Sequence, residues 1–193
     1  MNDREQRELL QSIVALGRAV FTARACSIMR FDADADELVF EAVAGEGEDT
    51  LVGRRIPSRS GVAGWVLHSE EAIAIEDVLH DPRFARDIAE STGYVPKGLT
   101  VFPLLHDEHA HGVISVLDRG GDGPVGLADM EVLGRLARLA AHALVAVEQA
   151  RRAATGEDDE LSRLSRALRA ADPARRAAAH DVLDGLRRLL DGP

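Results

Sequence analysis

The chain has a single cysteine, Cys26, among its 193 residues. One thiol allows no internal disulfide and excludes a zinc site built from several cysteines. Aromatic residues are also scarce, and Trp65 and Tyr94 are the only tryptophan and tyrosine. The charged start lacks a signal-peptide core, and the longest apolar stretch, near 139–147, is short and broken by His142. We therefore expect no membrane span and a cytoplasmic location.

Positive charge is also in short supply. There are 23 basic and 33 acidic residues, which gives a formal net charge of -10. Such a chain is not attracted to nucleic acid or to anionic lipid without a local basic patch. Residues 151–193 are nearly balanced, with nine arginines and eight acidic residues, and show no basic stripe. Nucleic acid and membranes are therefore not expected partners.

The apolar pattern predicts an α+β fold. Apolar residues recur at spacings of three and four in residues 9–21, which is typical of an amphipathic helix. Two β-prone runs flank an acidic turn at 32–36, and two more flank a polar turn at 106–111, so both pairs predict hairpins. Hairpins favour a largely antiparallel sheet with helices packed against it. The expected strands are 26–31, 37–44, 72–78, 99–105 and 112–117.

Three further helices are predicted. Ser60 is a suitable N-cap for a helix over 62–68, and Asp81-Pro82 is typical of a helix start, with an end near Gly93. A long helix is expected from about 128 to 153. Its apolar positions come close to a heptad seam: Met130, Leu133, Leu136, Ala140, Leu144 and Val147. We divide the chain into residues 1–153, one domain with its terminal helices, and a helical tail at 154–193.

Several short motifs occur in a characteristic order. They are Gly61-Val-Ala-Gly-Trp-Val66, Glu76-Asp-Val78, Asp81-Pro-Arg-Phe84, Val101-Phe-Pro-Leu-Leu105, Gly112-Val-Ile-Ser-Val-Leu117 and Asp129. Together they resemble a GAF domain over roughly residues 5–150. The resemblance implies a six-stranded antiparallel sheet with a ligand cavity on one face and dimerisation through the terminal helices. Thr50 to Ile56 is the expected sixth strand.

Departures from the motifs of known family members narrow the range of possible ligands. Cyclic-nucleotide-binding members carry an Asn-Lys, Phe, Asp-Glu signature, and the matching positions here are Asp118-Arg119, Val125 and Asp129-Met130. Only Asp129 is retained, which disfavours a cyclic nucleotide. We expect Arg119 and Asp129 to form a structural ion pair between the last strand and the final helix. The single cysteine does not suit bilin attachment and cannot complete the disulfide cycle of a free methionine sulfoxide reductase.

Six residues are candidates for the ligand pocket, because pockets are mostly apolar with a few polar groups. They are Trp65, Phe84, Ile88, Tyr94, Thr100 and Phe102. For each of them, simple core packing is an equal alternative. Strand alternation places either Thr100 and Phe102 or Leu99 and Val101 toward the cavity. The pattern does not distinguish the two arrangements.

Histidines offer one other site. His106, His109 and His111 have a spacing compatible with a transition-metal site. A solvated polar turn explains them better, since turns are normally polar. A haem ligand is also conceivable at His68 or His80, which lie nearer the expected cavity than His106. The sequence requires no cofactor.

The favoured interpretation is a non-catalytic regulatory sensor domain. It binds an unidentified small molecule and relays the signal through a helical homodimer to a separate partner protein. The alternative is a ligand-free dimerisation or interaction scaffold, and the third is a haem- or metal-linked sensor. An enzyme is disfavoured, because no nucleophile–base pair or metal set is recognisable in the sequence.

Overall fold

The computed structural model describes residues 3–86, 89–90, 93–121 and 123–155. The chain divides into two compact units, Met1–Glu148 and Gln149–Pro193. The whole sheet belongs to the first unit. The predicted tail at 154–193 lies outside the described residues apart from its first two positions, so it stays a prediction.

One antiparallel sheet of six strands forms the centre of the first unit, in the order β3-β2-β1-β6-β5-β4. The α+β fold and the six-stranded sheet are therefore confirmed. The two predicted hairpins, β1–β2 and β5–β6, meet along β1 and β6 at the middle of the sheet. The strands are β1 (Ala25–Asp32), β2 (Glu37–Gly45), β3 (Arg55–Pro57), β4 (Ile73–Ile75), β5 (Leu99–His106) and β6 (His109–Leu117).

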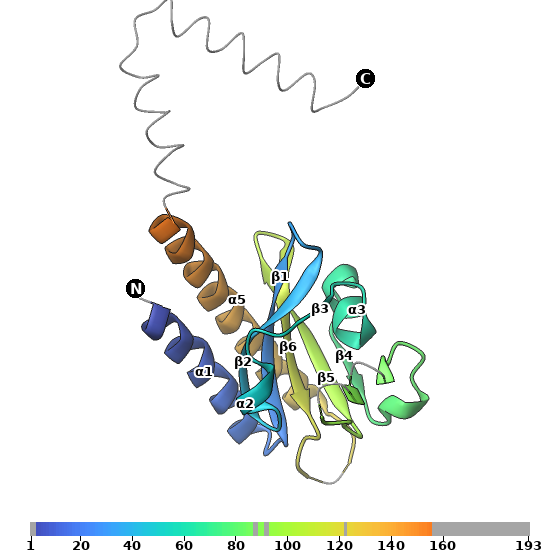
Figure 1. Cartoon of the computed structure of the whole chain (residues 1–193). Helices are drawn as coiled ribbons and strands as arrows, with labels where there is room; N and C mark the ends of the chain where they lie inside the picture. The colour runs from blue at the N-terminus through green and yellow to red at the C-terminus, as the bar shows by residue number, and fades with distance from the viewer. Residues whose placement is uncertain (1–2, 87–88, 91–92, 122, 156–193) are drawn as a thin grey trace, which may run out of the picture. The chain divides into compact units, whose positions relative to one another are not determined.

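Helices cover the two faces unequally, as Figure 1 shows. The terminal helices α1 (Asp3–Val20) and α5 (Leu127–Thr155) lie on one face. The other face carries α3 (Gly61–Ser69), with α2 (Glu48–Leu51) and the 3-10 turn η1 (Val78–His80) nearby in the chain. We call these the helix face and the cavity face.

Each face has its own apolar core. On the helix face, Val14 of α1 and Leu144 of α5 are fully buried with Ile28 and Ile114 of the central strands. On the cavity face, Val66 of α3 packs with the apolar side chains of the same strands. Both sides of the sheet are buried, so β1 and β6 contribute side chains to both cores.

The expected heptad seam of α5 faces inward. Leu133, Leu136, Ala140, Leu144 and Val147 are buried in the helix-side core, and Met130 is half-buried. An apolar stripe along one side of a helix can pack against a sheet as well as against another helix, so the heptad-like pattern does not by itself identify a coiled coil. A different set of apolar side chains stays exposed on the terminal helices: Leu9, Leu16, Val20, Val132 and Leu139.

Two predicted boundaries are wrong in detail. The sixth strand is Arg55–Pro57 rather than 50–56, because residues Glu48–Leu51 form the short helix α2. The predicted strand at 72–78 likewise shortens to Ile73–Ile75, and Val78 begins the 3-10 turn.

Asp81-Pro82 makes a turn instead of starting a helix. The Asp81 carboxylate accepts hydrogen bonds from the backbone N–H of Arg83 and from its guanidinium, at 2.7–2.9 Å. Aspartate side chains stabilise turns in this way. Helical residues begin only at Arg86.

Close backbone packing fixes the start of α3. A Cβ atom added at Gly64 would lie 2.5 Å from the carbonyl oxygen of Ser58. Only glycine permits this approach without a shift of the backbone. The glycine therefore holds α3 against the turn that precedes it, beside the cavity described next.

Candidate functional site

A cavity of about 130 Å³ lies on the cavity face of the sheet. Its floor comes from alternate residues of the central strands, including Ser27 and Met29 of β1 and Ser115 of β6. Its walls come from the start of α3 at residues 60–63 and from five later residues: Phe84, Ala85, Ala89, Tyr94 and Pro96. Residues of the sheet, of α3 and of the chain between β4 and β5 therefore all contribute to the lining of one pocket.

The lining is mostly apolar, with a few polar groups among the described residues. Ser27, Ser60, Ser115 and the ring of Tyr94 contribute polar or amphipathic character, and Glu46 is the one carboxylate. Arg24 binds this carboxylate, with a distance of 2.6 Å between its Nη2 and the Oε1 of Glu46. Ligand pockets commonly show such an apolar lining with a few orienting groups.

Tyr94 joins the cavity wall to the end of β6. Its hydroxyl donates a hydrogen bond to Oδ2 of Asp118. The other carboxylate oxygen accepts the backbone N–H groups of Lys97 and Gly98, each at 2.8 Å. Burial, together with the hydrogen bond to Asp118, raises the pKa of Tyr94 to about 12. Asp118 thus holds the loop at Tyr94, Lys97 and Gly98, and we call this set of contacts the loop clasp.

Arg119, the residue that follows Asp118, contacts the start of α5. Arg119 Nη1 lies 3.5 Å from Oδ2 of Asp129, in the first turn of α5, so the predicted ion pair is confirmed. The same Asp129 oxygen accepts the backbone N–H of Gly126 at 3.0 Å. A carboxylate at this end of a helix is favourable, because the first backbone N–H groups lack partners in the helix. Asp118 therefore holds the 94–98 loop, and its neighbour Arg119 holds the first turn of α5.

The predicted pocket residues separate into four groups. Phe84 and Tyr94 line the cavity, as expected. Trp65 lies outside it, in a neighbouring surface groove, where the Arg83 guanidinium sits 4.7 Å from the centre of its ring. Ile88 lies outside the described residues.

Thr100 and Phe102 are wrong as cavity residues. They point to the helix face, where Phe102 packs against the helix-side core and Thr100 is buried. Leu99 lines the cavity instead, and Val101 belongs to the cavity-side core. Both faces of β5 are covered, so alternation alone could not identify the cavity side.

Ser27 and Ser115 were missed by the sequence reasoning. They are direct cross-strand partners of β1 and β6, and both are buried. A signal was available: each is a lone hydroxyl within an otherwise apolar, buried strand. The pairing of the two strands, which are far apart in the sequence, was needed to place them together.

A family model for the GAF domain matches residues 5–144. The chain belongs to the GAF domain family. The probable 3',5'-cyclic phosphodiesterase pde-5 of Caenorhabditis elegans is 28% identical over 89 residues, or 46% of this chain and 12% of that protein. The chain thus spans about an eighth of this curated relative.

Solved GAF structures share the fold. The GAF domain of a phosphoenolpyruvate-protein phosphotransferase from Coxiella burnetii is 21% identical, with a TM-score of 0.66 over 79% of this chain and 86% of that one. The free methionine-R-sulfoxide reductase from Neisseria meningitidis, solved with its substrate, is 23% identical, with a TM-score of 0.60 over 75% of this chain and 81% of that one. At these identities the likeness extends to the fold alone.

Cys26 of this GAF domain lies away from the cavity. It is fully buried in the helix-side core, on the opposite face of β1 from Ser27. Burial raises the pKa of its thiol to about 12. A neutral thiol is a poor nucleophile, so Cys26 is a packing residue rather than a reactive group.

Three histidines lie close together on the helix side. The ring of His106 makes edge-to-face contacts with His111 and His142, at centroid distances of 5.8 and 5.4 Å. His109 is exposed at the start of β6. Over the described ranges, no three His, Cys, Asp or Glu side chains are arranged to hold a metal ion. His68 and His80, considered as haem ligands, bond instead to Gly64 and Asp77 and do not line the cavity.

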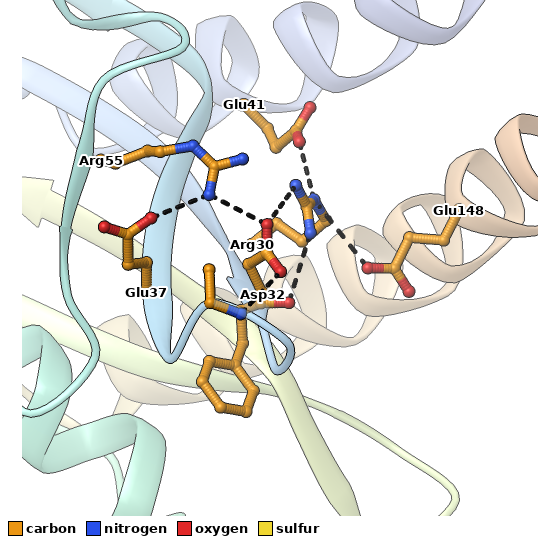
Figure 2. Close-up of polar contacts among 8 residues, drawn as sticks. Arg30, Asp32, Glu37, Glu41, Arg55 and Glu148 are labelled. Carbon is orange, nitrogen blue, oxygen red and sulfur yellow. Dashed lines mark hydrogen bonds and ion pairs between the residues drawn. The ribbon is translucent and has the colours of Figure 1, made fainter.

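An ion network attaches α5 to the first hairpin (Figure 2). Arg30 Nε lies 2.8 Å from Glu41 Oε1, and its guanidinium also approaches Asp32 and Glu148 at 3.8 and 4.0 Å. Arg55 extends the network from β3 by pairing with Asp32 and Glu37. None of the network residues named above lines the cavity.

None of the helices within the described part of the chain is both long enough and apolar enough to cross a membrane.

Proposed function

We propose that this GAF domain is a non-catalytic sensor that binds a small molecule in the cavity and reports occupancy through α5. The observation that carries the proposal is the cavity itself, a partly open apolar space with polar groups on its floor and a clasped loop as part of its wall. A domain that served only as a scaffold would be expected to fill this space, because protein interiors pack closely.

The route of the signal follows from the loop clasp. A ligand that displaces Tyr94 also displaces its partner Asp118, and Arg119 follows Asp118 directly in the chain. Arg119 holds Asp129 in the first turn of α5. Coupling between sites needs such a connected set of contacts with two alternative arrangements. The clasped and released loops are those two arrangements.

The output is a homodimer in this proposal. Leu16 of α1 and Leu139 of α5 are each about half exposed, at 51% and 52%. Together with Leu9, Val20 and Val132 they present apolar surface on both terminal helices, and contiguous apolar surface is typical of an interaction site. A change in the start of α5 would then alter the dimer and, through it, a separate partner protein.

Native mass spectrometry of the purified full chain tests ligand and dimer together. We expect a dimer that carries a small co-purified molecule. Ala63→Leu, which fills the cavity from α3, should remove that molecule and keep the dimer. Ala15→Leu on the exposed side of α1 is the matched control and should keep both.

Two results would overturn parts of this proposal. An empty dimer that gains no stability from any small molecule would support the ligand-free scaffold instead. A monomer at micromolar concentration would remove the dimer relay. Leu139→Asp separates the two functions, because it should dissociate the dimer while the cavity continues to bind.

A further inference from the structure

The cavity restricts its ligand by size. Its volume of about 130 Å³ is well below the roughly 300–1,000 Å³ of pockets for drug-sized ligands. A buried apolar cavity of about 150 Å³ holds a molecule of the size of benzene. Side chains such as Met29, Phe40 and Leu51 supply the apolar surface here. The ligand is therefore expected to have an apolar body of about one ring.

Two unpartnered hydroxyls mark the polar end of the site. Ser27 and Ser115 are only 6% and 4% exposed, and they face each other across β1 and β6. Neither hydroxyl bonds to any residue that the structure describes, yet neither is among the fully sealed polar atoms, so both oxygens border the cavity. A hydroxyl that borders a cavity and has no protein partner is available to donate or accept a hydrogen bond there. A ligand in the cavity can therefore bond to both serines.

A third hydroxyl has the same character. Ser60 occupies the N-cap position of α3, but its side chain makes no capping hydrogen bond. It lines the cavity from the side opposite the sheet. Serine at an N-cap normally accepts a backbone N–H of the first turn. Its hydroxyl is thus free to face a ligand.

The charges around the cavity disfavour an anion. No lysine, arginine or histidine lies among its described lining residues. The one acidic lining residue, Glu46, already has Arg24 as its partner. Moving an anion into an apolar space without a counter-charge is very unfavourable. Phosphate or carboxylate groups, including those of cyclic nucleotides, do not suit this cavity.

We infer that the cavity takes an uncharged molecule of about single-ring size whose one hydrogen-bonding group lies between Ser27 and Ser115. This inference rests on the proposed function and specifies the class of ligand. Phenol represents the class, toluene lacks the polar group, and benzoate adds a charge. The three probes have similar bodies, so differences in their binding report on the serines and on charge.

Saturation-transfer NMR and calorimetry on the full chain measure the three affinities. We expect phenol to bind roughly tenfold more tightly than toluene, which corresponds to one hydrogen bond, and benzoate not to bind. The double substitution Ser27→Ala/Ser115→Ala should reduce the affinity for phenol to that for toluene. Ser12→Ala on the exposed side of α1 is the control and should change neither. Thermal melts establish that each variant is folded.

The outcomes separate this inference from the proposed function. Equal binding of phenol and toluene, or a double variant with unchanged phenol affinity, overturns the serine subsite while cavity binding stands. Binding of benzoate as tightly as phenol overturns the neutral class. A co-purified ligand without binding of any probe overturns the size class. If no probe binds and nothing co-purifies, the proposed function itself fails.

Discussion

Tyr94 and Asp118 lie 24 residues apart in the chain, yet the tyrosine hydroxyl donates directly to the Asp118 carboxylate. The contact joins the loop over the cavity to the residue that follows β6. Asp118 adopts a positive φ of 48°, in the left-handed region that non-glycine residues seldom occupy. Backbone strain of this kind persists where surrounding contacts impose it, and it often marks functional sites.

The loop clasp predicts an unusual tyrosine titration. Tyr94 is the only tyrosine, so phenolate absorbance reports on it alone. Its pKa of about 12 should exceed the ordinary value of about 10. Asp118→Asn should lower the pKa but leave it above 10, because burial is the larger cause and persists.

The same shift makes stability depend on pH. A raised tyrosine pKa stabilises the folded state fully below about pH 10, and this contribution is lost as pH rises toward 12. Circular dichroism across that range should show the loss, and Tyr94→Phe should remove this component of the pH dependence. A wild-type titration near pH 10 with the fold intact would contradict the clasp.

Gly64→Ala should destabilise the domain. Alanine ordinarily favours a helix interior over glycine by about 1 kcal/mol. Here the new Cβ would meet the Ser58 carbonyl oxygen at 2.5 Å, so we expect a net loss of about 1–3 kcal/mol in denaturant unfolding. Gly126→Ala is the control, since its Cβ would meet only Asp129 at 3.8 Å. A stabilised Gly64→Ala would mean that α3 does not pack as described.

Arg30→Ala should weaken the attachment of α5. Its side chain is 18% exposed, and its loss removes one ion-pair partner from each of the Glu41 and Glu148 carboxylates. We expect a loss of about 2 kcal/mol, below the 3–5 of a fully buried pair. Arg55→Ala is the comparison: its side chain is 46% exposed, and surface pairs contribute little. Chemical denaturation measures both, and equal effects would refute the special role of Arg30.

Cys26 should resist thiol reagents in the folded protein. With a pKa of about 12, only about one thiol in ten thousand is ionised at pH 8. A colorimetric disulfide reagent should therefore label almost none of the native protein within an hour and all of it in denaturant. Stoichiometric labelling of native protein within minutes would show that the helix-side core opens readily.

The sequence predicts features that depend on neighbours along the chain. Alternating apolar residues predicted the strands of both hairpins, and apolar residues at spacings of three and four predicted the terminal helices. The short motifs in their order identified the family, and the Arg119–Asp129 pair followed from that resemblance. The Asp81 turn failed as a helix start, because aspartate followed by proline suits either structure and the Arg83 contact decided between them.

The residues that line the cavity could not be predicted from the alternation of side chains along each strand. Period two tells which residues of β5 share a face, but both faces are buried, so Leu99 and Phe102 were equally plausible inside the cavity. Ser27 and Ser115 become a pair only when β1 and β6, far apart in sequence, lie side by side.

The sequence by itself thus determined the family, the antiparallel sheet and the absence of reactive cysteine pairs, since these follow from composition and local pattern. The tertiary structure alone decided which strand faces line the cavity, that Asp118 clasps Tyr94, and that the apolar seam of α5 packs on the sheet. The physical reason is that long-range contacts choose between local arrangements of nearly equal free energy.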